Sequence, residues 1–227
     1  GITRRQALVG TATFAGYALA VDKVLAQAIK TDTEGLAAGD FGVKIGSFQV
    51  LQHRAVDMLV PNPGAMAQGA DPASWEQNFK LDVLGAVNAF DAAYPLLEAA
   101  AARHGDAAFV IIASVSAAVA DNASSYGPVK ASLIHMAKGL ARQHAKRRIR
   151  VNVVSPGMVY FEGGVWNMVE QNMPDFFKTA MARNPTGRAA TPQEVANAAV
   201  FLASPVSSYT TGVNLLVDGA ISNRVNF

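Results

Sequence analysis

The sequence predicts an α/β fold in which helices cover a parallel sheet. Three short runs of hydrophobic and β-branched residues, at 56–60, 109–112 and 150–154, are each followed by a longer segment with helical spacing of its apolar residues. Strands that are buried on both faces read as continuous hydrophobic runs, which is typical of parallel sheets. The alternation of such strands with helices predicts a doubly wound parallel sheet.

The composition is that of a globular protein with one domain. The chain has 227 residues, of which 51% are hydrophobic and 16% charged, so it can bury one substantial core. A formal net charge of +2 gives no reason to expect nucleic acid or an acidic membrane as a partner. The basic residues 146–148 and Arg150 follow a predicted helix, where cations suit the negative end of the helix dipole.

Metal and thiol chemistry have no support in the sequence. The chain has 0 cysteines, which leaves its redox compartment open. The 4 histidines lack the helical spacing of a metal-binding pair, and we expect them to be surface or helix-end residues. No metal site is therefore predicted.

Residues 1–28 support two interpretations, of which the first is an export leader. Thr3-Arg4-Arg5 matches a twin-arginine motif, Ala7 to Val21 is an apolar stretch, and Ala26-Gln27-Ala28 is a small-residue cleavage site. Residues 29–40 then resemble the start of exported dienelactone-hydrolase-like proteins. In this interpretation the protein is periplasmic.

In the second interpretation residues 1–28 are a degenerate first strand, turn and helix. Gln6 to Val9 is the strand, Gly10 to Gly16 is a phosphate-binding turn, and Ala15 to Ala28 is a helix whose N-terminus faces a pyrophosphate. In this interpretation the protein is cytoplasmic.

The segment that follows this turn is short. Gly10 and Asn62 are 52 positions apart, whereas three strand–helix units need roughly 70 residues. Within the connecting segment 29–55, Val43–Ile45 and Phe48–Leu51 alternate like short exposed strands. We therefore expect the N-terminal edge of the sheet to be truncated or rebuilt, ahead of a catalytic region at 56–227.

From Val56 the elements follow in regular order. The strand 56–60 is followed by a long helix, Trp75 to His104, with a start at Asp71-Pro72 and a stop at Gly105. The later elements are the strand 109–112, a helix from Tyr126 to Ala145, the strand 150–154, a segment rich in Met and aromatics at Gly163 to Arg183, a capped helix from Thr191 to Leu202, and a last strand within 211–219.

The chemistry is concentrated between Ser114 and Lys130. The strand 109–112 delivers Ser114 and Ser116 to its carboxyl end. Tyr126 and Lys130 open the next helix, and their i, i+4 spacing places phenol and ammonium on one face. A free tyrosine has a pKa of about 10, too high for acid–base work at neutral pH, and a nearby cation lowers it. The spacing predicts an acid–base tyrosine assisted by a lysine.

These residues resemble the catalytic half of the short-chain dehydrogenase/reductase family. The resemblance rests on Ser114, on Tyr126-Gly-Pro-Val-Lys130 and on the strand that ends in Ser155-Pro156-Gly157, in this order. It covers the chain from about Val56 to the C-terminus. It implies a Rossmann-like fold, NAD or NADP as the cofactor, and an oxidoreductase that interconverts a small-molecule alcohol and a carbonyl.

The resemblance also implies the role of each site residue. Tyr126 would be the general acid–base, Lys130 would lower its pKa and hold the nicotinamide ribose, and Ser114 would hydrogen-bond the substrate oxygen. Ser116 is an alternate to Ser114. The residues implied in cofactor binding are Asn62, Gly64, Tyr126, Lys130, Pro156, Gly157 and Val159, the last through its backbone beside the nicotinamide carboxamide.

The sequence departs from the family pattern at several positions. Val9 replaces a threonine, and Phe14 takes the place of the middle glycine in the phosphate-binding turn, where bare backbone approaches the cofactor. Pro63 removes a backbone donor on the adenosine-ribose side. Asp82 stands where relatives usually carry a catalytic asparagine, and its carboxylate would order a water or pair with Lys130.

Two further expectations come from the resemblance. In the family, the segment corresponding to Gly163 to Arg183 forms a variable lid over the substrate. The helices corresponding to Trp75 to His104 and Tyr126 to Ala145 pack across a two-fold axis, so we expect a homodimer or a homotetramer.

Two alternatives to a reductase stay open. A cofactor-free remnant, or a fusion of an unrelated leader to a dehydrogenase half, would at most self-associate. The altered glycine turn favours this alternative, and the intact pair of Tyr126 and Lys130 opposes it. A halohydrin dehalogenase-like lyase would share a Phe in the glycine turn, but those enzymes use arginine where this chain has Lys130.

Overall fold

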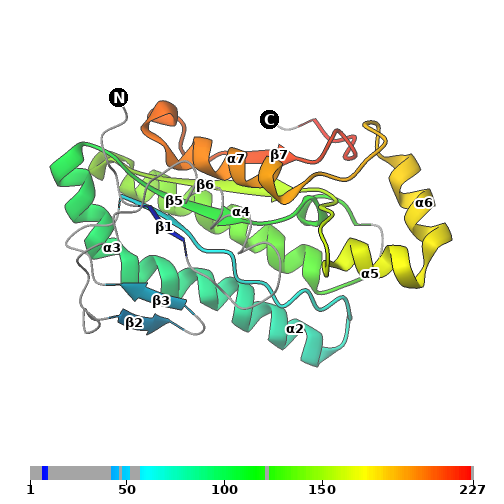
Figure 1. Ribbon diagram of the computed structural model, residues 1–227. Coiled ribbons are helices and arrows are strands. Elements are labelled where there is room, and N and C mark those ends of the chain that lie inside the picture. The colour runs from blue at the N-terminus through cyan, green and yellow to red at the C-terminus, as the bar shows by residue number, and fades with distance from the viewer. Residues whose placement is uncertain (1–6, 10–41, 46–47, 52–56, 121–122, 226–227) are drawn as a thin grey trace.

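A parallel sheet forms the centre of the molecule (Figure 1). The computed structural model describes residues 7–9, 42–45, 48–51, 57–120 and 123–225, with side chains from Asp57 onward. Within these ranges five parallel strands pair in the order β1-β4-β5-β6-β7. They are β1 (Ala7–Val9), β4 (Met58–Val60), β5 (Ala107–Ile112), β6 (Ile149–Pro156) and β7 (Asn214–Val217). The predicted α/β fold with a parallel sheet is confirmed.

The N-terminal edge of the sheet is rebuilt, as the sequence predicts. In a doubly wound sheet of order 3-2-1-4-5-6, the second and third strands extend the sheet beyond the first. Here β2 (Gly42–Ile45) and β3 (Phe48–Leu51) pair with each other in an antiparallel hairpin, at the positions predicted for two short strands. β1, beside β4, is the edge of the described sheet.

Of residues 1–28, the structure describes only β1. Its residues fall within the predicted strand Gln6 to Val9 and pair with β4. The twin-arginine motif, the turn from Gly10 to Gly16 with Phe14, and the cleavage site lie outside the described residues. The leader and the strand-turn-helix interpretations therefore both stay predictions.

The long helix predicted at 75–104 is present with a change of pitch near its start. α2 (Pro72–Asn78) is capped by Asp71, whose side chain accepts a hydrogen bond from the N–H of Ser74. α2 continues through a π-helical segment, η1 (Phe79–Leu84), into α3 (Gly85–His104). α3 ends at Gly105, whose φ of 80° suits glycine.

The remaining helices also match the predicted segments. α4 (Tyr126–His144) follows β5, and α7 (Pro192–Ala203) starts with a complete capping box between Thr191 and Glu194. Between β6 and α7 lie α5 (Val165–Asn172) and α6 (Pro174–Arg183). The short 3₁₀ turns are η2 (Val115–Ala117), η3 (Ala145–Arg147) and η4 (Pro205–Ser207). No helix within the described ranges is long and apolar enough to cross a membrane.

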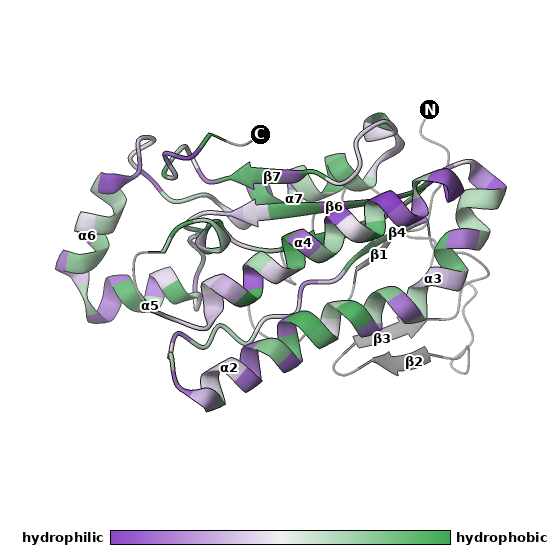
Figure 2. Ribbon diagram, turned by 180° about the vertical axis from the view of Figure 1, so that it is seen from behind, coloured by the Kyte–Doolittle hydropathy of each residue, from purple (hydrophilic) through white to green (hydrophobic). Residues whose placement is uncertain are grey.

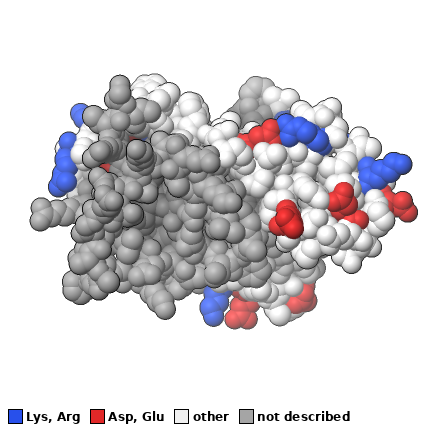
Figure 3. All heavy atoms as spheres, viewed as in Figure 1, with Lys and Arg blue, Asp and Glu red and all other residues white. Residues whose placement is uncertain are grey.

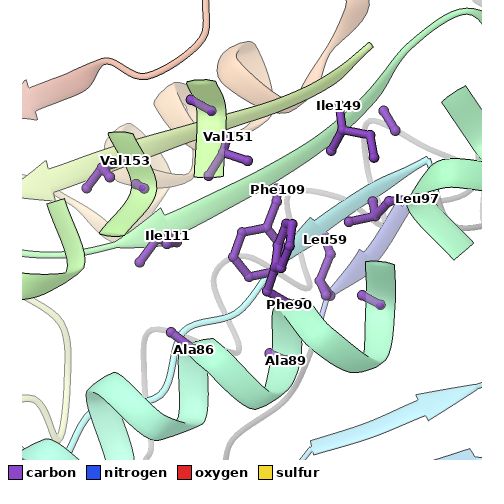
Figure 4. Close-up of a cluster of buried hydrophobic side chains, with 14 of the residues drawn as sticks. Leu59, Ala86, Ala89, Phe90, Leu97, Phe109, Ile111, Ile149, Val151 and Val153 are labelled. Atoms are coloured by element: carbon purple, nitrogen blue, oxygen red, sulfur yellow. The ribbon is translucent and has the colours of Figure 1, made fainter. Parts of the chain in front are cut away.

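Helices cover both faces of the sheet, and each face has its own hydrophobic core. On one face α3 and α4 pack on β5 and β6, where the rings of Phe90 and Phe109 meet edge to face at 5.1 Å (Figure 4). On the other face α7 packs on β4, β5 and β6 around Val110 and Leu202. Figure 2 shows the hydrophobic strands between helices that carry hydrophilic residues on their outer turns. The two cores fix the sheet from which the site residues emerge.

Arg150 and His144 are both buried. The sequence had indicated exposed positions for both, because Arg150 follows a helix and His144 ends one. Arg150 is 4% exposed and donates to both carboxylate oxygens of Asp106, to Ser207, and to the carbonyls of residues 202–204. It therefore ties β6 to the C-terminal end of α7, so the helix end that this cation complements is that of α7 and not that of the helix before it. His144 is 5% exposed between Phe90 and Tyr94, and burial lowers its pKa.

Candidate active site

The predicted catalytic residues lie at one edge of the sheet. Parallel strands all end at the same edge, and doubly wound folds bind ligands just outside it. β4 ends before the loop 61–70, β5 before Ser114, and β6 before Gly157. α5 and α6 lie at this same end of the molecule (Figure 1).

Tyr126 and Lys130 face each other on the first turns of α4. The Lys130 Nζ lies 5.6 Å from the centroid of the Tyr126 ring. Lys130 is 3% exposed and Tyr126 is half-buried, so the ammonium lies deeper than the tyrosine side chain. The ammonium also donates to the carbonyl of Ile112, at 3.4 Å, which connects α4 to the end of β5. The predicted i, i+4 arrangement is present.

Asp82 forms a buried ion pair with Lys130. The distance from Lys130 Nζ to Asp82 Oδ1 is 2.5 Å, and the two side chains are 4% and 0% exposed. The Asp82 Oδ2 accepts a hydrogen bond from the N–H of Ala65, at 3.1 Å. The expected pairing of this carboxylate with Lys130 is present. The pair joins α4, η1 and the loop after β4.

Asp82 reaches this position from the π-helical segment η1. A π-helical turn inserts a residue into an α-helix, and such turns are frequent at functional sites. Removing one member of a buried ion pair typically costs about 3–5 kcal/mol, because the other charge is left uncompensated. The pair is therefore a structural constraint on the site as well as an electrostatic one.

Asn78 and Ser125 position the loop 61–70 against the start of α4, and the sequence analysis did not identify either. Asn78 is fully buried, and its amide exchanges hydrogen bonds with the backbone N–H and carbonyl of Ala67. It also donates to the Ser125 Oγ at 2.8 Å, and Ser125 donates to the carbonyl of Gly69. The only local signal was that Asn78 lies four residues before Asp82 and so shares its helix face.

Ser114 lies at the end of β5 with its hydroxyl oxygen already used as an acceptor. Ser114 is 9% exposed, and its Oγ accepts a hydrogen bond from the N–H of Ser116, at 3.1 Å. No acceptor for the Ser114 hydroxyl proton occurs among the described residues, so it is available to a ligand oxygen. Ser116 follows within η2 and is half-buried.

Gly127 allows η2 and α4 to approach each other. A Cβ at Gly127 would lie 2.6 Å from the carbonyl oxygen of Ser116, a distance that real Cβ atoms do not show. A larger residue would therefore push the Tyr126 turn away from the serines. Glycine therefore follows Tyr126 for a steric reason. The spacing of Tyr126 and Lys130 does not by itself predict it.

The residues expected to contact the cofactor lie around the same edge. Asn62 is half-buried, and a Cβ at Gly64 would lie 3.8 Å from Asp82 Oδ1 and 3.9 Å from Lys130 Nζ, so this loop lies against the ion pair. Pro156 ends β6. Gly157 packs so closely on Asp218 that a Cβ would lie 2.8 Å from its Cα. Packing alone therefore accounts for glycine at 157.

Val159 offers backbone groups that fit an amide ligand. It is 2% exposed and sits in a bridge in which Tyr160 donates to the carbonyl of Ala190 and Ala190 donates to the carbonyl of Met158. In this arrangement the N–H and C=O of Val159 itself make no hydrogen bond within the described part of the chain. Buried backbone groups normally have a partner. The residues present thus fit the nicotinamide end of a dinucleotide, while the turn expected at the pyrophosphate lies outside the described residues.

α5 and α6 carry an apolar surface in the segment expected to be a lid. Met168, Met173 and Phe176 are 49%, 51% and 57% exposed. The rings of Trp166 and Phe176 are nearly parallel, with their centroids 6.5 Å apart. Tyr160, at the base of this segment, is hydrogen-bonded to Glu170, which raises the pKa of the tyrosine. The segment therefore presents apolar and aromatic groups beside charged ones such as Asp175 and Lys178.

Charged residues do not gather into a patch of one sign on the visible described surface. Figure 3 shows Lys and Arg there scattered among Asp and Glu. No cluster of three or more His, Cys, Asp or Glu side chains that could hold a metal ion occurs in the described ranges.

The comparison with family models decides the classification. Residues 47–222 match the family model described as enoyl-(acyl carrier protein) reductase. The chain belongs to the short-chain dehydrogenase/reductase family. Isoepoxydon dehydrogenase of Penicillium expansum is 34% identical over 174 residues, which are 76% of this chain and 66% of that protein. Galactitol 2-dehydrogenase (L-tagatose-forming) of Cereibacter sphaeroides is 37% identical over 171 residues, 72% of this chain and 65% of that protein.

Solved structures of short-chain dehydrogenases/reductases agree with the fold. One from Burkholderia xenovorans has a TM-score of 0.68 at 31% identity, covering 76% of this chain and 67% of that one. The NADH-dependent reductase A1-R′, responsible for alginate metabolism, has a TM-score of 0.64 at 27% identity, covering 75% and 66%. This chain spans about two thirds of the length of the curated relatives that it matches. The predicted family and the Rossmann-like fold are confirmed.

Substitutions at two glycines of α4, Gly127 and Gly139, test whether η2 packs closely against the start of this helix. We expect Gly127→Ala to destabilise the protein by about 1–3 kcal/mol, because the added methyl overpacks against the Ser116 carbonyl. The matched control is Gly139→Ala in the same helix, where nothing lies within 4 Å of the added Cβ. That change is expected to stabilise by about 0.5–1 kcal/mol. Thermal unfolding of the two variants measures the difference, and equal melting temperatures would contradict the close approach.

Proposed function

We propose that this protein is an NAD(P)-dependent oxidoreductase that interconverts a small-molecule alcohol and its carbonyl. The observation that carries the proposal is the half-buried Tyr126 facing the buried ammonium of Lys130, at 5.6 Å from ring centroid to Nζ. Both lie beside Ser114 at the sheet edge where doubly wound folds bind ligands. Relatives that match the chain include dehydrogenases of isoepoxydon, galactitol and cis-4-hydroxycyclohexanecarboxylate, which favour a hydroxyl-bearing substrate class.

Each catalytic residue has one role in the proposed mechanism. Ser114 donates its free hydroxyl proton to the substrate oxygen and orients it toward Tyr126. In reduction, the Tyr126 hydroxyl gives its proton to the developing alkoxide, and in oxidation the phenolate takes it back. Lys130 stabilises the phenolate through its positive charge and holds a ribose hydroxyl of the cofactor. Ser116 anchors Ser114 through its N–H.

The cofactor would be NAD or NADP, and it supplies or accepts the hydride. Val159 would bind the carboxamide through its two unused backbone groups, and Pro156 and Gly157 shape the loop that presents them. Asn62 and Gly64 would contact the ribose on the adenosine side, next to the Asp82–Lys130 pair. One structural relative is an NADH-dependent reductase.

Self-association through α2, η1, α3 and α4 is also proposed. Trp75, Phe79, Leu81 and Leu84 are 42%, 50%, 41% and 41% exposed along the start of this long helix. An apolar face of this kind is stabilised when a second copy covers it.

Light scattering tests the assembly. We expect a dimer or tetramer at micromolar concentration, and we expect Phe79→Asp to dissociate it, because the change places a charge in the apolar contact. Phe176→Asp on α6, 57% exposed, is the matched control and should leave the assembly intact. A monomeric wild-type protein would contradict the proposal.

Substitution of Tyr126 tests the proposed oxidoreductase activity. Tyr126→Phe should abolish turnover of ketones with NADH or NADPH, because it removes the proton donor and little else. Dinucleotide binding by the variant should equal that of the wild type. Tyr209→Phe is the control, because Tyr209 is fully exposed and lies far along the chain from the site.

Equal turnover by wild type and Tyr126→Phe would rule out the proposed mechanism. Absence of turnover together with absence of dinucleotide binding would favour the cofactor-free remnant. A halide-dependent activity that survives without a dinucleotide would favour the dehalogenase-like alternative, which Lys130 opposes.

A further inference from the structure

The lysine of the catalytic pair is itself ion-paired with a carboxylate. Asp82 Oδ1 lies 2.5 Å from Lys130 Nζ, whereas the same nitrogen lies 5.6 Å from the centroid of the Tyr126 ring. Both charged side chains are removed from water, with exposures of 0% and 4%. In such surroundings the two charges act on each other, and on any neighbouring group, more strongly than at the surface.

Lys130 of α4 lies over the Tyr126 ring, and Asp82 of η1 pairs with Lys130. α2, which also packs on α4, carries Glu76, and that side chain is exposed to solvent. The loop 61–70, the end of β5 and η2 contain no ionisable side chain other than hydroxyls. Within the described part of the chain, the cation that lies against the Tyr126 ring is therefore paired with an anion.

We infer that Asp82 is a positioning residue that holds Lys130 and offsets its charge, and so keeps Tyr126 in the phenol form at neutral pH. The phenol is the form that donates a proton to a carbonyl. The electrostatic coupling is a property of the folded chain, and its effect on turnover rests on the proposed function.

Asparagine at position 82 would release the lysine. The carboxylate serves two partners at once: one oxygen accepts from the N–H of Ala65, and the other forms the ion pair with the ammonium of Lys130. An amide has one acceptor oxygen, and its NH₂ group cannot accept from an ammonium. In Asp82→Asn the amide oxygen can remain with Ala65, and Lys130 then has its full charge available to a phenolate. Asp82→Glu keeps the charge and serves as the conservative control.

Ultraviolet titration of tyrosinate tests the coupling without any need for turnover. The chain has 5 tyrosines, so the Tyr126 signal is the difference between each protein and its own Tyr126→Phe counterpart. We expect the ionisation midpoint of Tyr126 to fall by roughly one to three pH units in Asp82→Asn, as an uncompensated cation close by would cause. In Asp82→Glu it should remain near the wild-type value. Coincident midpoints in wild type and Asp82→Asn would overturn the inference.

The pH dependence of kcat/KM gives a second readout that a merely structural role would not move. In Asp82→Asn the rise of alcohol oxidation with pH and the fall of ketone reduction with pH should both move to lower pH, by the same amount as the titration midpoint. Asp82→Glu should restore the wild-type position even where its kcat is lower. A lower kcat with unmoved midpoints would make Asp82 structural only.

Two further outcomes have definite meanings. A shifted titration midpoint in a protein without turnover would uphold the coupling and reject the proposed function. If Asp82→Asn does not fold, Asp82→Ser, which also removes the charge in a smaller side chain, replaces it in both experiments with the same expected shift.

Discussion

The buried ion pair between Asp82 and Lys130 is the interaction on which the candidate site depends. Its 2.5 Å contact joins α4 to η1, and the second carboxylate oxygen holds the loop after β4 through Ala65. Lys130 in turn reaches the end of β5 through the Ile112 carbonyl. Four segments from different parts of the chain are thus fixed around two charges. Because neither charge is solvated, each holds the other in place.

Much of the fold and the chemical core of the site could be predicted because they follow local rules. Hydrophobic runs locate β5 and β6, the i, i+4 spacing places Tyr126 over Lys130, and Thr191 with Glu194 marks the start of α7. The shortage of residues before Asn62 predicts the rebuilt sheet edge, where β2 and β3 form a hairpin of their own. The family assignment agrees with these expectations.

The rest could not be predicted because it depends on contacts between residues far apart in the chain. Asn78 meets Ser125 across 47 positions, and Arg150 meets Asp106 across 44, and no periodicity encodes either pair. The π-helical turn that carries Asp82 and the close packing of Gly127 on Ser116 follow from tertiary fit rather than from helix propensity. Polar residues in such pairs look like ordinary surface residues until the fold brings them together.

The central claim is that this site binds a nicotinamide dinucleotide against Tyr126, Lys130 and Val159, and a fluorescence titration of the full chain with NADH and NADPH tests it most directly. The account predicts saturable binding of at least one of the two below millimolar concentration, with displacement by the matching oxidised dinucleotide. Fluorescence that does not saturate with either dinucleotide up to millimolar concentration would contradict it.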